Sequence, residues 1–312
     1  MSLRSEMQTL LRRSVAKVIG EYPAPALAHA QELLQDLEAA AGGSTADGEW
    51  SVFAAQISRA LREHGADRFL RLGPIAQTLH PRIRSPGSRY VRYVFRSGKL
   101  SSRLHTALTE SPIGQPLLNP YYALSSPLLI QHGYHLLRLL EATDFDLARA
   151  RLIVEFGGGY GSFFRLLRNM DYRERYIICD LPVMCALQRF YLRNMFPTDP
   201  GGLPPENLTW LCGTFREALE RETAGQRPSL FVATWSLSET PLHVRDQIAP
   251  ALGGFSYILC AYQREFAGCD NVHYFRALEQ QLPQFAWQHA ECPVYKNNFY
   301  LIGANRLQPG RA

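Results

Sequence analysis

The chain has 312 residues, 46% of them hydrophobic and 20% charged, and a formal net charge of +5. These values describe an ordinary globular protein, long enough for one large domain or two smaller ones. No apolar run approaches the roughly 20 residues that a membrane span needs, and residues 1–20 lack the apolar core and cleavage site of a signal peptide. The six cysteines form no C-x-x-C pair, so reduced thiols in the cytoplasm are expected and structural zinc is not.

Residues 1–115 are expected to form an all-helical N-terminal domain. Apolar residues recur at helical spacing in three segments separated by proline or glycine turns, 3–19, 27–37 and 52–61. Gly65 is expected to cap the third helix. The turn-rich segment 111–116 then leads into a second domain, 116–312, which opens with a helix over 128–140. The helical domain is expected to serve as a lid, a substrate domain or a dimerisation unit, so a homodimer is one expected assembly.

The positive charge is spread unevenly along the chain. Between Asp67 and Glu110 there is no acidic residue, whereas nine arginines and lysines fall between 68 and 103. One interpretation is a field that attracts an anionic substrate, such as a nucleotide-sugar. The alternative is a solvated face, or a contact with acidic helices elsewhere. The aromatic residues of this stretch form no recognisable nucleic-acid-binding motif, so nucleic acid is not expected as a partner.

The segment 152–162 reads Leu-Ile-Val-Glu-Phe-Gly-Gly-Gly-Tyr-Gly-Ser and carries the strongest signal in the chain. An apolar strand ends in a carboxylate, Glu155, and apolar residues at helical spacing resume at Phe163. The glycines between them are Gly157, Gly158, Gly159 and Gly161. Strand, glycine turn and helix form the geometry in which bare backbone approaches a nucleotide closely. A strand-to-helix turn without a ligand is the alternative.

The residues around this turn discriminate between nucleotides. A dinucleotide fingerprint requires glycine or alanine where this chain has Ser162. Glu155 would also meet the pyrophosphate of a dinucleotide as a like charge. A carboxylate at this position suits a ligand that carries an ammonium or sulfonium group and no phosphate. S-adenosylmethionine is such a ligand.

Short apolar runs alternate with helical segments from about residue 150 onward. Strands are expected at 152–156, 176–180, 208–212, 230–234 and 257–261, and helices at 183–195, 215–221 and 244–252. This alternation predicts an α/β fold with a mostly parallel sheet covered on both faces. A hairpin of 292–296 with 299–303 is expected to end the sheet in antiparallel fashion, which fits a methyltransferase sheet better than an all-parallel dehydrogenase sheet.

The second expected strand ends in Asp180, about 20 residues beyond the glycines, where a nucleotide-binding unit places the carboxylate that accepts hydrogen bonds from ribose hydroxyls. Leu181 and Pro182 stop the strand at this point. Taken singly, Asp180 is equally well explained as a helix cap. Its distance from Glu155 and the glycines favours ribose binding.

The pattern Glu-x-Gly-x-Gly-x-Gly at 155–161 resembles the first motif of the class I S-adenosylmethionine-dependent methyltransferases. Over 119–303 the chain resembles the sugar O-methyltransferase family of bacterial surface-polysaccharide gene clusters. The residues that carry this likeness are 119–120, 134–135, 154–162, 180–182, 235–239, 261–263 and 270–271. The resemblance implies a Rossmann-like methyltransferase sheet. It also implies that S-adenosylmethionine is bound by Glu155, Gly157, Gly158, Gly159, Gly161, Asp180, Leu181 and Trp235.

The segment 234–243, after the fourth strand, is where chemistry is expected, because ligands of open α/β sheets lie beyond the carboxyl ends of the strands. An enzyme that methylates a sugar hydroxyl has to align that hydroxyl and remove its proton. His243 and Glu239 are the candidate bases. The alternative for His243 is a surface histidine at the start of a helix. The alternative for Glu239 is a cap of the same helix start.

Three further residues are expected to hydrogen-bond the substrate, or else to anchor loops: Tyr262, Gln263 and Asn271. Glu239, Asp270 and Asn271 also leave a magnesium-assisted reaction open, in which a hard cation lowers the pKa of the hydroxyl. The favoured prediction is a reaction that does not depend on a metal.

The sequence thus predicts a cytoplasmic S-adenosylmethionine-dependent O-methyltransferase that acts on a hydroxyl of a sugar, nucleotide-sugar or glycan precursor. A small aromatic or natural-product acceptor is the alternative within this class. A non-catalytic methyltransferase-like partner subunit and a nicotinamide-dependent oxidoreductase are the alternatives outside it.

Overall fold

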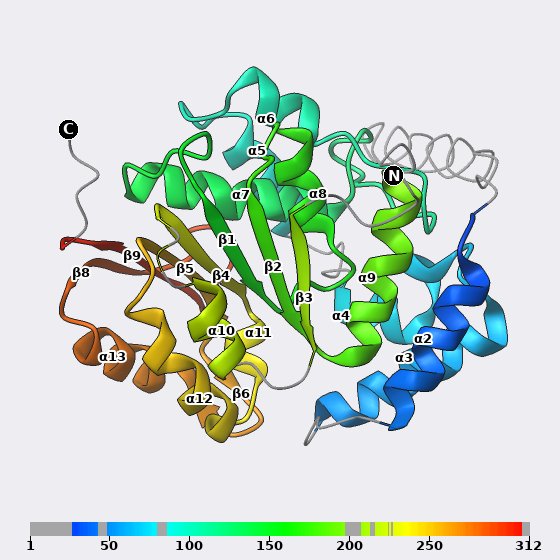
Figure 1. Cartoon of the computed structure of the whole chain (residues 1–312). Helices are drawn as coiled ribbons and strands as arrows, with labels where there is room; N and C mark the ends of the chain where they lie inside the picture. Colours follow the sequence, from blue (N-terminus) through cyan, green and yellow to red (C-terminus); the bar gives the residue numbers. More distant parts are fainter. Residues whose placement is uncertain are drawn as a thin grey trace.

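A seven-stranded sheet forms the centre of the molecule, with strands in the order β3-β2-β1-β4-β5-β9-β8 (Figure 1). The computed structural model describes residues 27–42, 49–79, 86–196, 207–212, 216–223, 225 and 227–307. The strands are β1 Leu152–Phe156, β2 Arg175–Asp180, β3 Leu208–Cys212, β4 Ser229–Thr234, β5 Tyr257–Gln263, β8 Phe285–Glu291 and β9 Asn298–Asn305. The first five are parallel, β9 runs antiparallel to β5, and β8 runs antiparallel to β9.

The helices fall into an N-terminal group and a group that alternates with the strands. The first group comprises α2 Ala30–Gly42, α3 Glu49–His64, η1 Phe69–Arg71, α4 Gly73–Leu79, α5 Pro86–Val94 and α6 Ser102–Ala107. The second comprises α7 Pro127–Ala142, α8 Ser162–Asn169, α9 Pro182–Met195, α10 Arg216–Thr223, α11 Ser236–Glu239, α12 Leu242–Leu252 and α13 Asn271–Gln281. A short ribbon, β6 Glu265–Phe266 with β7 Cys269–Asp270, precedes α13. The helix expected over 3–19 lies outside the described residues.

Alternate residues of each strand face opposite layers, as the pleat of a strand requires. Ile153 of β1 packs with α7, α8 and α9, whereas Leu152 and Val154 pack with α10, α12 and α13. The two helical layers lie on opposite sides of the sheet (Figure 1). Strands buried on both faces are apolar along their whole length, which explains why their positions could be predicted from short apolar runs.

The N-terminal helices share one hydrophobic core with the α7–α9 layer. Helix α2 lies along α9, where Arg189 Nε and Asp36 Oδ2 are 2.8 Å apart and Arg193 pairs with Glu32. The predicted cap at Gly65 is confirmed: its φ is +72°, and its N–H donates to Leu61 O over 3.0 Å at the end of α3.

The predicted fold class is confirmed, including its antiparallel C-terminal end, but one strand was misplaced. Residues 292–296 form the connection between β8 and β9, and the strand itself is 285–291. Pro293 lacks the N–H that a ladder requires, which argues against a strand there. Strand β8 is an edge strand that has polar residues in its second half, Gln288, His289 and Glu291, so its apolar run is only three residues long and too short to indicate a strand.

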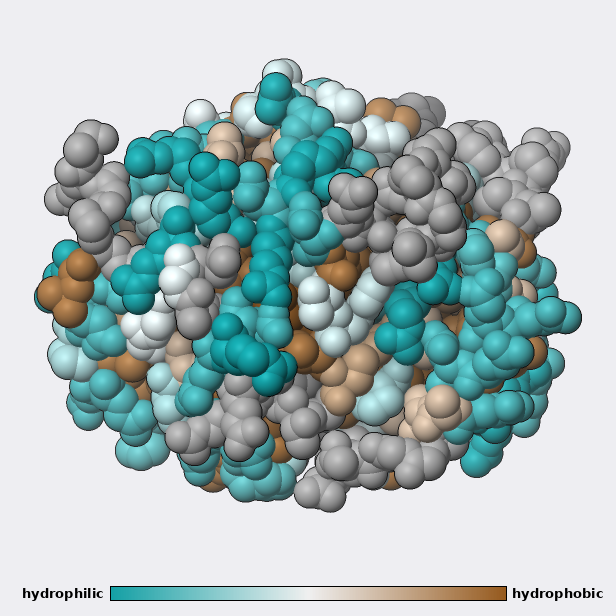
Figure 2. Space-filling model, in the orientation of Figure 1, coloured by the Kyte–Doolittle hydropathy of each residue, from teal (hydrophilic) through white to brown (hydrophobic). Residues whose placement is uncertain are grey.

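The surface in Figure 2 is largely hydrophilic, with apolar groups scattered among polar ones, as is usual for a water-exposed face. No helix in the described segments combines the length and the apolar character that a membrane span requires.

Candidate functional site

The carboxyl ends of β1, β2, β4 and β5 lie at one edge of the sheet, because these four strands are parallel. The glycine turn follows β1, Asp180 ends β2, Trp235 follows β4 and Gln263 ends β5. The fold therefore brings together at this edge most of the residues that the sequence assigned to the site. Ligands of open α/β sheets bind at this edge.

The glycine turn is required by sterics as well as by conformation. Gly157 has a φ of +76°, and its N–H donates to Cys179 O over 2.8 Å. A Cβ atom at Gly157 would lie 2.2 Å from Ser236 Cβ, so the backbone of the turn touches the segment after β4 directly. Gly159 and Gly161 also have positive φ angles, of 58° and 92°, and Gly161 is the N-cap of α8. Only glycine adopts such angles at little cost.

Gln188 on α9 ties the glycine turn to the end of β2. Its Nε2 donates to Gly159 O over 2.9 Å and to Asp180 Oδ2 over 2.7 Å. The other carboxylate oxygen of Asp180 accepts the N–H of Leu181 over 2.8 Å. Burial raises the pKa of Asp180 to about 7, although these hydrogen bonds act in the opposite direction. The turn and the carboxylate are thus held at a fixed separation before any ligand binds.

Glu155 lies beneath the glycine turn and is 2% exposed. Tyr176 Oη donates to its Oε2 over 2.7 Å. A Cβ atom at Gly158 would be 3.2 Å from the same oxygen, so a larger residue there would crowd the carboxylate. Burial raises the pKa of Glu155 to about 8; the hydrogen bond from Tyr176 lowers it, and the charge of Asp180 raises it further. The site therefore combines one buried and one half-buried carboxylate, Glu155 and Asp180, whose ionised forms are disfavoured in the free protein.

Replacing Glu155 with glutamine is expected to change how stability depends on pH. The pKa of Glu155 rises from 4.5 to about 8 on folding, so between these values the folded protein binds a proton that the unfolded chain has lost. Unfolding releases that proton, and the free energy of unfolding falls as pH rises through the window. Glu155→Gln removes this contribution, which is on the order of 5 kcal/mol. Denaturant titrations at both ends of the window measure it; equal pH dependence in the two proteins would contradict the assignment.

Trp235 occupies a strained position directly after β4. Its φ is +66°, which is costly for a residue with a bulky side chain. Its N–H donates to Ala261 O over 2.6 Å, and its Nε1 donates to Asn298 Oδ1 over 2.8 Å. Its ring packs at 83° against that of His135 on α7, with centroids 5.6 Å apart. Strain of this kind is typical of functional positions.

The two predicted bases lie in different surroundings. Glu239 ends α11, and its Oε1 accepts a hydrogen bond from Gln263 Nε2 over 3.1 Å. The fold thus places Glu239 beside one of the predicted substrate residues. His243 is exposed in the first turn of α12. Neither position by itself identifies the base, and both roles stay predictions.

Asn271 and Tyr262 lie inside the protein. Asn271 is fully buried: its Oδ1 accepts from Arg245 Nη1 over 2.7 Å and its Nδ2 donates to Gln263 O over 3.0 Å. Tyr262 stacks between two rings on the α13 face of the sheet, those of Phe275 and Phe299, and its hydroxyl contacts His289 Nε2. These contacts fix both side chains within the fold, so their predicted contact with substrate requires these bonds to rearrange.

Metal binding at this edge has little support from the arrangement of acids. Asp270 caps α13, with its Oδ1 accepting the N–H of His273 over 3.0 Å. In the described part of the chain, no three His, Cys, Asp or Glu side chains are grouped so as to hold a metal ion.

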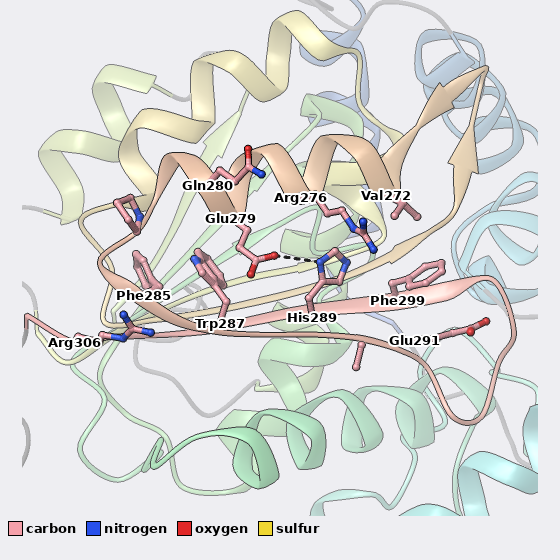
Figure 3. A pocket seen from close by; sticks show the side chains of 12 residues that line it. Val272, Arg276, Glu279, Gln280, Phe285, Trp287, His289, Glu291, Phe299 and Arg306 are labelled. Atoms are coloured by element: carbon pink, nitrogen blue, oxygen red, sulfur yellow. Dashed lines mark hydrogen bonds and ion pairs between the residues drawn. The ribbon is translucent and has the colours of Figure 1, made fainter.

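A cavity of about 680 Å³ lies elsewhere, between α13 and β8 (Figure 3). Trp287, His289 and Phe299 form its floor, and Glu279 Oε2 lies 3.3 Å from His289 Nδ1. A smaller cavity of about 350 Å³ is lined by residues of the basic stretch and its neighbours, namely His64, Arg68, Arg71 and Leu72. Neither cavity includes a residue that the sequence assigned to the cofactor.

No protein-family model and no curated protein matches the sequence of this chain. Among solved structures, it is similar to the methyltransferase domain of bacterial CtHen1, with 9% identity, a TM-score of 0.42, and coverage of 56% of this chain and 97% of that one. It is also similar to precorrin-6y C5,15-methyltransferase from Geobacter metallireducens GS-15 (14% identity, TM-score 0.40, coverage 58% and 88%). The pyocyanin biosynthetic protein PhzM covers more of the chain (12% identity, TM-score 0.37, coverage 87% and 72%).

The mixed seven-stranded sheet, with its antiparallel C-terminal strands and N-terminal helices, is a Rossmann-like methyltransferase fold. Identities this low identify no activity and no substrate.

Proposed function

We propose that this protein is an S-adenosylmethionine-dependent methyltransferase that transfers a methyl group to a hydroxyl. The proposal rests on the arrangement of three features: the glycine turn, Glu155 beneath it and Asp180 beside it. Gln188 links the turn to Asp180 through two hydrogen bonds. Asp180 offers carboxylate oxygens to the two hydroxyls of a ribose. Glu155 offers a negative charge to the cationic end of the same ligand.

The electrostatics favour this cofactor over a dinucleotide. The pKa values of Glu155 and Asp180 are both raised, so the protein itself does little to stabilise negative charge at this edge. A pyrophosphate placed against the turn would add negative charges beside two acids, whereas an ammonium or sulfonium group would stabilise their ionised forms. The bare backbone at Gly157 and Gly159 allows a ligand to approach closely.

The chain's own residues have limited tasks in such a reaction. The bound cofactor supplies an electrophilic methyl group on a sulfonium. The protein then has to align the acceptor hydroxyl with that methyl group, exclude water and accept the hydroxyl proton. The segment from Trp235 to Glu239 is suitably placed for the acceptor, because it contacts the glycine turn through Ser236 and Gly157.

We propose a sugar, nucleotide-sugar or glycan precursor as the acceptor, following the resemblance at residues 119–303. The cavity beside Arg68 and Arg71 supports an anionic partner for the basic stretch. A small aromatic acceptor is the second candidate, since the ring of Trp235 packs against that of His135, whose centroid lies 5.6 Å from that of Tyr300 and 6.1 Å from that of Tyr134.

The release of S-adenosylhomocysteine from S-adenosylmethionine tests this function. The assay offers the protein three acceptor groups: UDP-sugars, methyl glycosides and catechols, each with magnesium or with EDTA. We expect turnover with a hydroxylated acceptor from the first two groups, and equal rates with magnesium and EDTA. Turnover of catechols alone would show that the acceptor is aromatic and not a sugar. No turnover in any arm, with binding of the cofactor intact, would favour a non-catalytic partner subunit.

A further inference from the structure

The two ring nitrogens of His135 on α7 lie in different surroundings. Its Nδ1 lies 2.5 Å from Tyr300 Oη. Its Nε2 is buried and has no hydrogen-bond partner among the described residues. The ring packs against Trp235, directly after β4, where the acceptor is expected. A buried polar atom without a partner costs free energy, which a ligand that supplies the missing hydrogen bond would recover.

A second such atom lies one helical turn away on the same face of α7. Gln131 precedes His135 by four residues, and both side chains are 1% exposed. Gln131 Nε2 donates to Tyr90 Oη over 3.2 Å, but its Oε1 has no partner within the described part of the chain. A carbonyl oxygen and an imidazole nitrogen with a lone pair both accept hydrogen bonds. The pair therefore suits a ligand with two hydroxyl groups.

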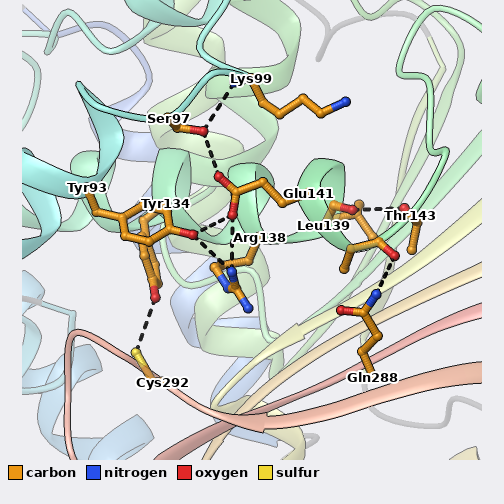
Figure 4. A network of polar contacts seen from close by, with 11 residues as sticks. Tyr93, Ser97, Lys99, Tyr134, Arg138, Leu139, Glu141, Thr143, Gln288 and Cys292 are labelled. Carbon is orange, nitrogen blue, oxygen red and sulfur yellow. Dashed lines mark hydrogen bonds and ion pairs between the residues drawn. The ribbon is translucent and has the colours of Figure 1, made fainter.

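Helix α7 is held firmly at its C-terminal end, in the two turns that follow His135. Arg138 Nη1 donates to Tyr93 Oη over 2.9 Å and to Glu141 Oε2 over 3.1 Å (Figure 4). Ser97 Oγ donates to Glu141 Oε1 over 2.7 Å on one side, and Gln288 Nε2 donates to Ala142 O over 2.8 Å on the other. A group fixed by its surroundings in this way can position a reacting atom.

We propose that His135 is the general base for methyl transfer and that the acceptor lies between α7, Trp235 and Tyr300, with one hydroxyl on His135 Nε2 and a second on Gln131 Oε1. This inference rests on the proposed function. The hydroxyl oxygen bonds to the methyl carbon as the carbon–sulfur bond breaks, and the bonding pair stays on sulfur, leaving a neutral thioether. The hydroxyl proton moves to Nε2. In this tautomer Nδ1–H donates a hydrogen bond to Tyr300 Oη, which orients the ring, as the third group of a catalytic triad does.

The histidine is neutral before the reaction, as a base must be. Burial and the neighbouring His132 hold the pKa of His135 well below its ordinary value. The proposal requires one of the two neutral tautomers, with the proton on Nδ1 and the lone pair on Nε2. A histidine that only fills the core could equally carry its proton on Nε2, so the tautomer separates the two roles.

The protonation state of His135 is read directly from long-range ¹⁵N–¹H spectra of protein labelled at histidine. The signals of His135 are assigned by their loss in His135→Gln. If His135→Gln fails to fold, they are assigned by their change in Tyr300→Phe, which preserves the ring packing. We expect a protonated Nδ1 and an unprotonated Nε2, and a shift of the Nε2 signal when S-adenosylhomocysteine is added. His132 is the matched control: it is buried on the same helix but packs against Phe163, and its signals should shift less.

Activity gives the second readout. We expect His135→Asn to release S-adenosylhomocysteine roughly 100-fold more slowly with the acceptor panel above, with its affinity for S-adenosylhomocysteine within about twofold of wild type, and His273→Asn, the same change at an exposed histidine, to keep its activity. A proton on Nε2, or full activity in His135→Asn, would overturn the inference while leaving the proposed function intact. Failure of the wild-type protein to bind S-adenosylhomocysteine would overturn both.

Discussion

Replacing Asp180 with alanine is expected to abolish cofactor binding while leaving the protein folded. The carboxylate is positioned by Gln188 and by the N–H of Leu181, and it is the group we propose to accept hydrogen bonds from both ribose hydroxyls. Hydrogen bonds to a charged group contribute about 1.5–3 kcal/mol each. Loss of the pair should therefore weaken binding of S-adenosylhomocysteine by at least roughly 100-fold. Isothermal titration calorimetry measures this change.

The fold should tolerate the substitution because the ionised form of Asp180 is costly in the free protein. Its pKa is raised to about 7 from 3.8, so the folded state loses stability as pH rises between these values, and Asp180→Ala removes that loss. Asp67→Ala, the same change at an exposed position, is the matched control and should bind like wild type. Unchanged affinity in a folded Asp180→Ala protein would contradict the ribose-binding role.

Gly157→Ala is expected to destabilise the protein and to prevent cofactor binding. The new Cβ would be 2.2 Å from Ser236 Cβ, and the backbone there has a φ of +76°. The left-handed conformation costs an alanine about 1–2 kcal/mol, and relief of the overlap requires the turn or the segment after β4 to move, which adds about 1–3 kcal/mol. The sum should lower the melting temperature by roughly 5 °C or more.

Two other glycines separate the two contributions to the cost of Gly157→Ala, backbone strain and steric overlap. Gly65 has a φ of +72°, and no heavy atom of the described residues lies within 4 Å of the Cβ that alanine would add, so Gly65→Ala carries the backbone strain alone. Gly73 has neither a positive φ nor such a neighbour in the described segments, so Gly73→Ala should be nearly neutral. Gly157→Ala should exceed Gly65→Ala in cost, and Ser236→Gly should restore part of the difference. Equal costs for Gly157→Ala and Gly65→Ala would show that the contact with Ser236 does not constrain the turn.

The parallel part of the sheet and the first half of the site could be predicted because both are local in sequence. Each central strand is a short apolar run, and Glu155, the glycines and Asp180 stand at the ends of two of them. Strand β8 could not be predicted in the same way, because it lies at the edge of the sheet and its apolar run is interrupted after three residues by Gln288 and His289. Its neighbour β9 is paired on both sides and was predicted within a few residues.

Gln188 and His135 were not assigned to the site, because their roles depend on how helices lie against the sheet. Gln188 reaches the glycine turn only because α9 folds back along β2, and His135 meets Trp235 only because α7 crosses the end of β4. A signal was present in both cases: each is a polar residue on a helix whose other residues are largely buried and apolar. A buried polar side chain needs a hydrogen-bond partner, and residues of a functional site often supply it.

Calorimetric titration of the wild-type protein with S-adenosylhomocysteine and, separately, with NADH distinguishes a methyltransferase cofactor site from a dinucleotide site. We expect S-adenosylhomocysteine to bind at one site per chain, with an affinity unaffected by EDTA, and NADH not to bind. Binding of NADH without S-adenosylhomocysteine, or of neither ligand, would contradict the assignment of the glycine turn and its two carboxylates to a methyltransferase cofactor.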